Sequence, residues 1–235
     1  MSLTPEKAEI IGALIGDKTR FGFFKRYRKW KRRNPLRGVF EICLGTNPEW
    51  GSHLSALTLK AYGLKGCTYA LRKPPPRRTE WRFTVSSSRA VRDLSAYLNI
   101  GCNARTWRIS AALMDASTQT VSGLLRGYMD ADGFVHSSNT RGVRVHSVNE
   151  AGLRQVSQLF SKLEISSRMY LIRTTQVWAL QITRQENVLR YRQLVGFSLA
   201  HKKRALDSIC RRYRPLLVEM PIHTALSAMK TNPLC

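Results

Sequence analysis

The sequence predicts an α+β protein made of two pseudo-symmetric αββαββα domains. Each domain is expected to hold a four-stranded antiparallel sheet, and the two pack together through one helix from each. Three observations support this prediction. An eight-residue segment occurs twice, shorter matches follow both copies in the same order, and both copies show the same succession of helical and alternating apolar patterns. Weak identity with preserved order is typical of a duplicated unit.

The repeated segment begins each half. Residues 10–17 read IIGALIGD and residues 125–132 read LRGYMDAD, with glycine third, a small residue seventh and aspartate eighth. Downstream, RGV at 37–39 recurs at 141–143, YALR at 69–72 recurs loosely as YLIR at 170–173, and IG at 100–101 recurs as VG at 195–196. The offset between the copies falls from 115 to 104 to 95, so the first half is expected to have the longer loops.

Both halves predict the same elements in order. Thr4 followed by Pro5 is typical of a helix start, and Ser117 is the expected cap of the second copy of that helix. In the first half, strands are expected at 20–28 and 37–45, a helix at 53–64, strands at 68–73 and 80–85, and a helix at 88–98. The corresponding ranges in the second half are 134–138, 141–147, 150–163, 168–173, 176–182 and 184–194. Ser52 and Asn149 are the expected caps of the two middle helices.

The chain is expected to divide into a first domain at 1–110, a second at 111–213 and a C-terminal tail at 214–235. The linker lies near 106–117, and one more helix is predicted at 202–213. The tail shows no strong periodicity, so it is either a short helix or a loose segment.

Small residues form a stripe on each repeated helix. Gly12 and Gly16 lie four residues apart, as do Gly127 and Ala131, and the other positions are almost all apolar. Glycine inside a helix costs about 1 kcal/mol relative to alanine. Close packing of the two helices against each other would explain this cost. The alternative is that each helix packs only beneath its own sheet.

An aspartate ends each repeated helix. Asp17 and Asp132 face the negative end of the helix dipole, which is unfavourable by about 0.3–1 kcal/mol. If the helices pack in parallel, the two carboxylates lie side by side and repel each other unless they are protonated or neutralised. Mg²⁺, or another divalent cation such as Mn²⁺, is a natural neutraliser beside nucleic-acid phosphates. The alternative is that both are ordinary helix-end residues.

The charge balance indicates a polyanionic partner. The chain has 39 Lys and Arg against 15 Asp and Glu, a net charge of +24, yet 43% of its residues are apolar, enough for a core. Nucleic acid is the leading partner, ahead of an anionic membrane surface. The polar N-terminus and the absence of a membrane-spanning run predict an intracellular protein, cytoplasmic in a prokaryote, with an organellar origin left open. The five cysteines show no C-x-x-C spacing, which argues against a zinc ribbon.

Two kinds of basic residue are candidates for DNA contact. Residues 25–33 hold seven basic residues in nine, and a stiff KPPPRR turn spans 73–78. Such clusters are expected to bind phosphates, whereas isolated polar residues on strands are expected to read bases. The phosphate candidates are Lys25, Arg26, Arg28, Lys29, Arg77 and Arg78. The base-reading candidates are Arg72, Arg82, Arg144, His146, Arg168 and Arg173.

The repeated segments resemble the motif of the LAGLIDADG homing endonucleases. LRGYMDADG at 125–133 is the closer match, and residues 10–18 are looser, with Lys18 where the family usually has glycine. The resemblance covers about residues 5–213 and is to the single-chain, two-motif branch. It implies that the motif helices form the interface between the halves. It also implies that Asp17 and Asp132 are catalytic, bind divalent metal with help from the Gly16 and Ala131 carbonyls, and each direct hydrolysis of one DNA strand.

The resemblance further implies a site-specific double-strand DNA endonuclease that is monomeric and has a long recognition site. An intron-encoded origin is favoured, with an intein remnant left open. Lys18 predicts an asymmetric pair of sites, and Asp130, which has no acidic counterpart in the first copy, is expected to be structural. Polar and basic side chains are expected beside the aspartates. The candidates are Thr46 or Asn47, Ser147 or Asn149, Arg105 or Arg108, and His201, Lys202 or Lys203. The alternative functions are an RNA-binding intron maturase and a DNA-binding regulator on the same fold, but retention of both aspartates favours the nuclease.

Overall fold

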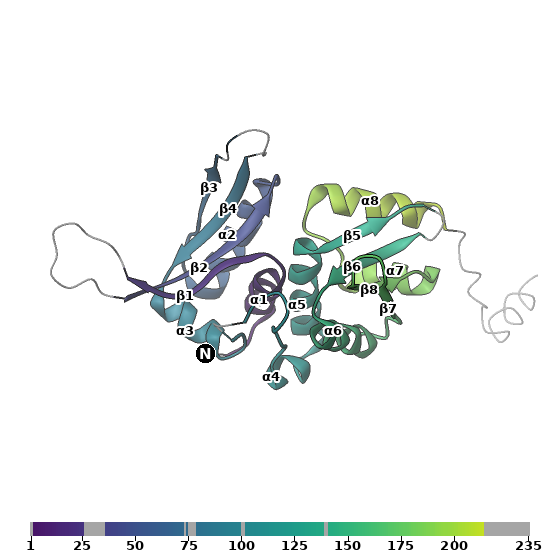
Figure 1. Cartoon of the computed structure of the whole chain (residues 1–235), viewed down its shortest axis with the longest axis horizontal. Helices are drawn as coiled ribbons and strands as arrows, with labels where there is room; N and C mark the ends of the chain where they lie inside the picture. The colour runs from purple at the N-terminus through teal and green to yellow at the C-terminus, as the bar shows by residue number, and fades with distance from the viewer. Residues whose placement is uncertain are drawn as a thin grey trace, which may run out of the picture.

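The computed structural model describes residues 2–25, 36–72, 74, 79–99, 102–138 and 141–213. Figure 1 shows two lobes, each with its own sheet, that meet where helices α1 and α5 lie side by side. The expected α+β architecture with two four-stranded antiparallel sheets is confirmed. The predicted tail at 214–235 lies outside the described residues.

The first lobe contains three helices and four strands in the described residues. They are α1 (Pro5–Asp17), β1 (Lys18–Lys25), β2 (Leu36–Gly45), α2 (Glu49–Tyr62), β3 (Cys67–Leu71), β4 (Glu80–Ser86) and α3 (Ser88–Ser95). The sheet order is β1-β2-β4-β3. Helix α3 packs against β1 and β2, while α2 contacts β3, β4 and α1.

The second lobe repeats this plan with two additions. Its elements are α4 (Ala111–Met114), α5 (Thr118–Ala131), β5 (Gly133–His136), β6 (Gly142–Ser147), α6 (Glu150–Lys162), β7 (Arg168–Ile172), β8 (Val177–Ile182), α7 (Gln185–Leu194) and α8 (Ala200–Arg211). The sheet order, β5-β6-β8-β7, is the same as in the first lobe. The short helix α4 was not predicted. Helix α8 packs against α7, β5 and β6, and no described helix is both long and apolar enough to cross a bilayer.

The helix starts follow the expected caps with one exception. The side chains of Thr4, Ser117 and Asn149 each accept a hydrogen bond from a backbone amide of their helix, as predicted. The prediction that Ser52 caps α2 was wrong, because that helix begins at Glu49 behind Pro48. Proline is tolerated at a helix start, where the backbone amides lack intrahelical partners and a missing N–H costs little.

The sheet registers define an inner and an outer face for each sheet. Phe40 and Ile42 of β2, and Val143 and Val145 of β6, are fully buried and face the helices. Lys18 and Gly133, the residues directly after the two aspartates, pair with Ile42 and Val145. The structural offset between β2 and β6 is therefore 103, one less than the offset of 104 inferred from the repeated RGV tripeptide. The outer faces carry Glu41 and Arg144 at equivalent positions.

Helices α1 and α5 pack in parallel through their small residues. A Cβ added to Gly12 would lie 2.0 Å from the carbonyl oxygen of Leu124, and one added to Gly127 would lie 1.9 Å from that of Glu9. At the C-terminal end, a Cβ on Gly16 would lie 2.4 Å from the Ala131 Cβ. Only glycine permits backbones to approach this closely. The expected packing of the lobes through these helices is therefore present.

Candidate active site between the two lobes

The parallel packing of α1 and α5 brings their C-terminal aspartates together. Asp17 is the last residue of α1, and Asp132 is the C-cap of α5. A Cβ on Gly16 would lie 3.3 Å from Asp132 Oδ2, so the Asp132 carboxylate reaches across to the end of α1. Within the described residues, neither carboxylate accepts a hydrogen bond or forms an ion pair.

Both aspartates hold protons more tightly than usual. Desolvation by the surrounding protein raises the pKa of Asp17 from 3.8 to about 6, with the nearby Glu80 adding to the rise and Lys202 opposing it. Desolvation, and then the charge of Asp17, raise the pKa of Asp132 to about 7. Asp17 is half-buried, while Asp132 stays exposed on one side. The pair is thus crowded by protein yet accessible to a ligand.

Lys202 lies beside this pair. Its ammonium donates to the carbonyl oxygens of Met129 at 3.2 Å, Asp130 at 2.5 Å and Ala131 at 3.4 Å, at the negative end of α5. Burial lowers the pKa of Lys202, while the carboxylates of Asp130, Asp17 and Asp132 oppose that shift. Of the three basic candidates at 201–203, Lys202 is the one directed at the aspartates. The Ala131 carbonyl, expected to help hold a metal, here accepts from this lysine.

Asp130 fixes the position of Lys202. Its carboxylate accepts hydrogen bonds from the Ser198 amide at 3.1 Å, the Ser198 hydroxyl at 2.5 Å and the Leu199 amide at 3.3 Å. These contacts tie the start of α8 to the last turn of α5. Asp130 is 1% exposed, which agrees with the structural role expected for this residue.

A cavity of about 370 Å³ opens beside Asp17. Its wall combines the ends of α1 and α5, the start of α8 and the turn that follows β2. Polar side chains from that turn, Thr46 and Asn47, share the lining with Asp17, Cys43 and Lys202. Thr46 and Asn47 were the polar candidates for the first site, and the structure places both of them there.

The equivalent candidates for the second site form contacts within the protein. Asn149 caps α6 through the Gly152 amide at 3.1 Å and donates to the Trp107 carbonyl at 2.7 Å. Arg108 donates to the Asn149 side chain at 3.0 Å. Lys18 is also engaged, because its ammonium donates to the Cys102 carbonyl and lies 3.2 Å from the Cys102 thiol. The surroundings of the two aspartates therefore differ.

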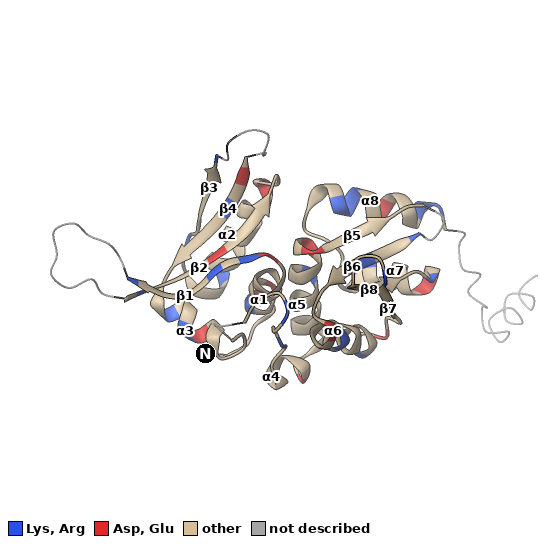
Figure 2. Ribbon diagram, in the orientation of Figure 1, with Lys and Arg blue, Asp and Glu red and all other residues tan. Residues whose placement is uncertain are grey.

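Apart from Arg82, the DNA-contact candidates fall into three groups. Arg144 and His146 of β6 and Arg168 of β7 lie on the outer face of the second sheet, whose strands contain no acidic residue. Lys25 ends β1, Arg72 follows β3, and Arg173 lies in the β7–β8 turn. Arg26, Arg28, Lys29, Arg77 and Arg78 lie outside the described residues. Figure 2 shows basic segments in both lobes and an acidic one at the end of α5 nearest the centre.

Arg82 has a different environment from the one expected. It was expected to be a base-reading residue on a strand, and its guanidinium also forms ion pairs with Glu41 at 2.9 Å and Glu80 at 2.8 Å, which were not expected. Alternation along a strand predicts the face of a residue but not its cross-strand partner, so this pairing was missed. Glu41 and Glu80 were not identified as functional candidates from the sequence.

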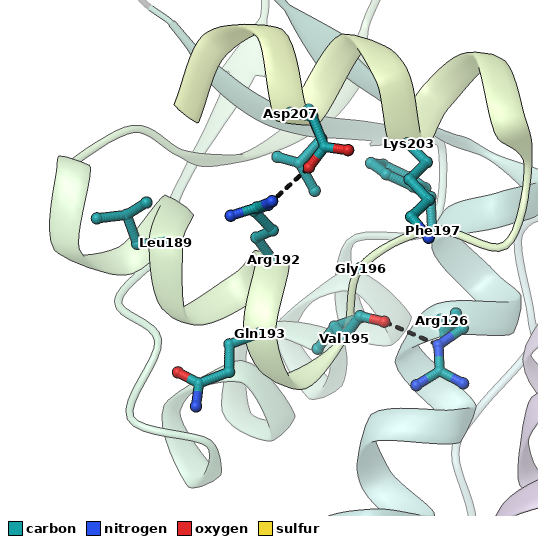
Figure 3. Close-up of a pocket in the computed structure, with 10 residues that line it drawn as sticks. Arg126, Leu189, Arg192, Gln193, Val195, Gly196, Phe197, Lys203 and Asp207 are labelled. Carbon is teal, nitrogen blue, oxygen red and sulfur yellow. Dashed lines mark hydrogen bonds and ion pairs between the residues drawn. The ribbon is translucent and has the colours of Figure 1, made fainter. Parts of the chain in front are cut away.

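A larger cavity of about 640 Å³ lies between α5, α7 and α8 (Figure 3). Its charged groups are largely occupied. Arg192 pairs with Asp207 at 2.6 Å, and Arg126 donates to the Val195 carbonyl at 2.8 Å (Figure 3). Neither motif aspartate lines it. The smaller cavity beside Asp17 is therefore the better candidate for the active site.

Comparisons with known proteins identify the fold. Residues 119–196 match the family model described as a LAGLIDADG-like domain. The chain is 32% identical over 111 residues to a probable translation initiation factor IF-2 of Thermococcus kodakarensis (strain ATCC BAA-918 / JCM 12380 / KOD1). That alignment covers 47% of this chain but only 9% of the relative. The chain thus spans about a tenth of that relative's length.

Solved structures match more of the chain. I-DmoI in complex with DNA and Ca has a TM-score of 0.60 at 16% identity, covering 88% of this chain and all of that one. I-DmoI with DNA and Mn gives 0.57, also at 16% identity, covering 83% and 97%. The homing endonuclease I-WcaI bound to its DNA recognition sequence gives 0.58 at 11% identity, covering 86% and 88%. The resemblance to LAGLIDADG proteins, first indicated by the two repeated segments, is confirmed by the family model over residues 119–196, and the solved structures share the fold.

Proposed function

We propose that this LAGLIDADG-family chain is a site-specific double-strand DNA endonuclease that acts as a monomer with divalent metal, Mg²⁺ or Mn²⁺, at Asp17 and Asp132. One observation carries the proposal. The carboxylates of Asp17 and Asp132 lie side by side at the ends of two parallel helices, and neither forms an ion pair with a cationic side chain in the described residues. This arrangement is costly for the folded chain alone and suits a cation-binding function.

The residues present fit a divalent metal. The donors are hard oxygens from Asp17 and Asp132 and the carbonyls of Gly16 and Ala131, the second of which also accepts from Lys202, and Mg²⁺ and Mn²⁺ prefer such oxygens. The Tyr128 hydroxyl is buried and makes no hydrogen bond of standard geometry in the described residues, although the Ser147 side chain lies within reach of it. Burial, and then the charge of Asp132, raise the pKa of that phenol. The local environment therefore contains two carboxylates without a direct cation partner and a poorly satisfied polar atom.

The bound metal would neutralise charge developing on a scissile phosphate and lower the pKa of an attacking water. The chain's own residues supply the rest. Asp17 and Asp132 would hold the metal, and Lys202 would place a positive charge beside the phosphate. Thr46 and Asn47 would orient water or phosphate at the wall of the cavity beside Asp17. Because α1 and α5 supply one carboxylate each, a single chain would contain both sites.

Strand cleavage by matched variants tests the proposal. Target duplexes are first selected from a randomised library by binding to the full chain, then incubated with Mg²⁺. Wild type is expected to cut both strands, whereas Asp17→Asn and Asp132→Asn should bind the same duplexes and lose most double-strand cleavage. Terbium luminescence gives a second readout, because the double variant should lose bound Tb³⁺. Full cleavage by Asp17→Asn, Asp132→Asn would contradict the assignment of these residues.

A matched lysine variant tests the part assigned to Lys202. Lys202→Met keeps much of the side-chain length and removes the charge, so cleavage should fall while duplex binding remains. Lys203→Met, one residue along on the exposed side of α8, is the control and should cleave like wild type. No observation within the described residues favours RNA over DNA, so the maturase alternative is not proposed.

A further inference from the structure

Glu41 carries a buried carboxylate, although its side chain belongs to the outer face of the first sheet. It lies at the middle of β2 between Phe40 and Ile42, which point into the core, so its own side chain belongs to the outer face. The residue is nevertheless only 3% exposed. Outer-face polar residues on the strands are the ones expected from the sequence to read bases.

The other three strands of the first sheet supply donors to this carboxylate. Oε1 accepts from the Thr19 hydroxyl of β1 at 2.8 Å and from Arg82 Nη1 of β4 at 2.9 Å. Oε2 accepts from the Tyr69 hydroxyl of β3 at 2.6 Å. Burial opposes ionisation, but the hydrogen bonds from Tyr69, Thr19 and Arg82 outweigh it and hold the pKa of Glu41 below its usual range. Glu41 is therefore an ionised acceptor that joins all four strands of the first sheet.

Arg82 is held from two sides. Besides the bond to Glu41, its Nε donates to Glu80 Oε1 at 2.9 Å, and Nη2 lies 2.8 Å from the same oxygen. A guanidinium has five N–H donors, and these contacts use three, which leaves two for a ligand. The side chain remains 23% exposed. An arginine fixed in this way loses less conformational entropy on binding than a free one.

The second sheet carries the opposite charge at the position equivalent to Glu41. Lys18 and Gly133, the residues after the two aspartates, pair with Ile42 and Val145, which makes Arg144 the equivalent of Glu41. Tyr170 is likewise the equivalent of Tyr69, and its hydroxyl donates to Gln181 at 3.2 Å. At this position the second sheet thus carries Arg144 itself, whereas the first sheet carries Glu41, which anchors Arg82 of β4.

We infer that Glu41 is a positioning residue for DNA recognition by the first lobe, which, with the support of Tyr69, holds Arg82 in a fixed arrangement for reading base edges in the major groove. This inference rests on the proposed function. Arginine presenting two N–H groups matches the O6 and N7 acceptors of guanine. Glu41 itself does not contact the base, because all of its described contacts are to the protein.

Base preference separates this role from simple support of the sheet. The full chain and its variants select duplexes from a randomised library, and competition binding at fixed salt then measures each single base-pair change. Glu41→Gln keeps the shape and removes the charge. It should lower discrimination about tenfold at one or two base pairs of one half-site, the scale of one bidentate contact. Nonspecific affinity and its salt dependence should stay unchanged. Arg144→Gln is the matched control and should lower discrimination in the other half-site only.

A milder variant keeps the test decisive if Glu41→Gln does not fold. Tyr69→Phe removes one donor to Glu41 without touching Arg82, and it should produce a smaller loss in the same half-site. Unchanged base preferences in folded Glu41→Gln would show that Glu41 only stabilises the sheet, and an equal loss of discrimination in both half-sites would show the same. If Glu41→Gln does not fold, these two outcomes are judged on Tyr69→Phe instead. A wild-type chain that selects no sequence would overturn the proposed function together with this role, whereas selection by wild type with unaltered variants overturns the role alone.

Discussion

Glu9 of α1 and Arg126 of α5 form an ion pair that joins the two lobes. Arg126 Nη1 lies 3.2 Å from Glu9 Oε2, and His53 Nε2 of α2 lies 2.6 Å from Glu9 Oε1. Glu9 is 4% exposed, because its helix is enclosed by α5 on one side and by the first sheet on the other. The carboxylate therefore sits at the junction of three helices, two turns before Asp17.

Glu9→Gln should destabilise the chain by about 1–3 kcal/mol, because it removes a buried charge and replaces one of the two acceptor oxygens that Arg126 and His53 contact with an NH2 group. Thermal unfolding measures the loss. The control is Glu150→Gln, which breaks an exposed pair with Arg154 on α6 and should cost only about 0.3–0.5 kcal/mol. Adding Arg126→Gln to Glu9→Gln should cost less than the sum of the single changes, and strict additivity would show that the pair does not couple the lobes.

Gly12→Ala and Gly127→Ala should each destabilise the chain, although alanine is the better helix former. In an open helix either change would stabilise by about 1 kcal/mol. Here the new Cβ would meet a carbonyl oxygen of the opposite helix at 2.0 or 1.9 Å, and such overpacking costs about 1–3 kcal/mol. The sign of the change in melting temperature decides, with Ser52→Ala on the exposed face of α2 as a near-neutral control. A rise in melting temperature for both glycine variants would mean that the helices do not approach this closely.

The helix interface could be predicted from the sequence because its determinants are local. Gly12, Gly16, Gly127 and Ala131 are spaced by four, and a helix places such residues on one face whatever surrounds it. The same period brings Asp17 and Asp132 to equivalent ends. Their juxtaposition followed from the repeat itself, which relates one helix to the other by approximate symmetry.

The polar networks could not be predicted, because their partners are distant in sequence. Lys202 is 71 residues from Ala131, whose carbonyl it contacts, and the sequence left it equal to His201 and Lys203. The Glu41–Arg82 contact depends on the pairing of β2 with β4, which places Cys43 opposite Arg82. A pattern of alternation gives no register between two strands. Arg82 was consequently interpreted as a base reader without its partners Glu41 and Glu80.

Asp17→Asn and Asp132→Asn should stabilise the metal-free chain, and increasingly so as the pH rises. The folded pKa values, about 6 and about 7, lie above the usual 3.8. A raised carboxyl pKa means that the unfolded chain loses its proton at a lower pH than the folded chain. The resulting loss of folding stability is absent below pH 4, grows above it, and is complete above pH 7. Each kcal/mol gained should raise the melting temperature by roughly 2–4 °C for a chain of this size.

Melting curves with a chelator from pH 4 to pH 8 measure this effect. The difference between each asparagine variant and wild type should be near zero at pH 4 and largest at pH 8. Asp207→Asn is the control, since Asp207 pairs with Arg192 outside the site, and it should not gain stability at pH 8. A wild-type advantage that grows with pH would show that the two carboxylates are paired with a cation in the chain itself.

The basic cluster at 25–33 and the isolated basic residues on or beside the strands should divide phosphate binding from base reading. Neutralising Lys25, Arg26, Arg28 and Lys29 to glutamine should weaken binding to every duplex alike. Each lost phosphate contact should flatten the log–log salt dependence of the binding constant by about 0.9, because fewer counterions are released. Arg173→Gln, in the β7–β8 turn, should instead relax discrimination at particular base pairs by about 1–3 kcal/mol and leave the salt dependence nearly unchanged.

Titrations at several salt concentrations with cognate and scrambled duplexes distinguish the two effects. The two groups differ in their surroundings. A contiguous basic cluster contacts the phosphate backbone of DNA, which is the same in every sequence, whereas an isolated side chain beside a sheet edge contacts one base pair at a time. The fourfold glutamine variant should therefore keep its ratio of cognate to scrambled affinity. If it lost only cognate affinity and kept the wild-type salt slope, the cluster would be the base-reading surface and the assignments of the two groups would have to be exchanged.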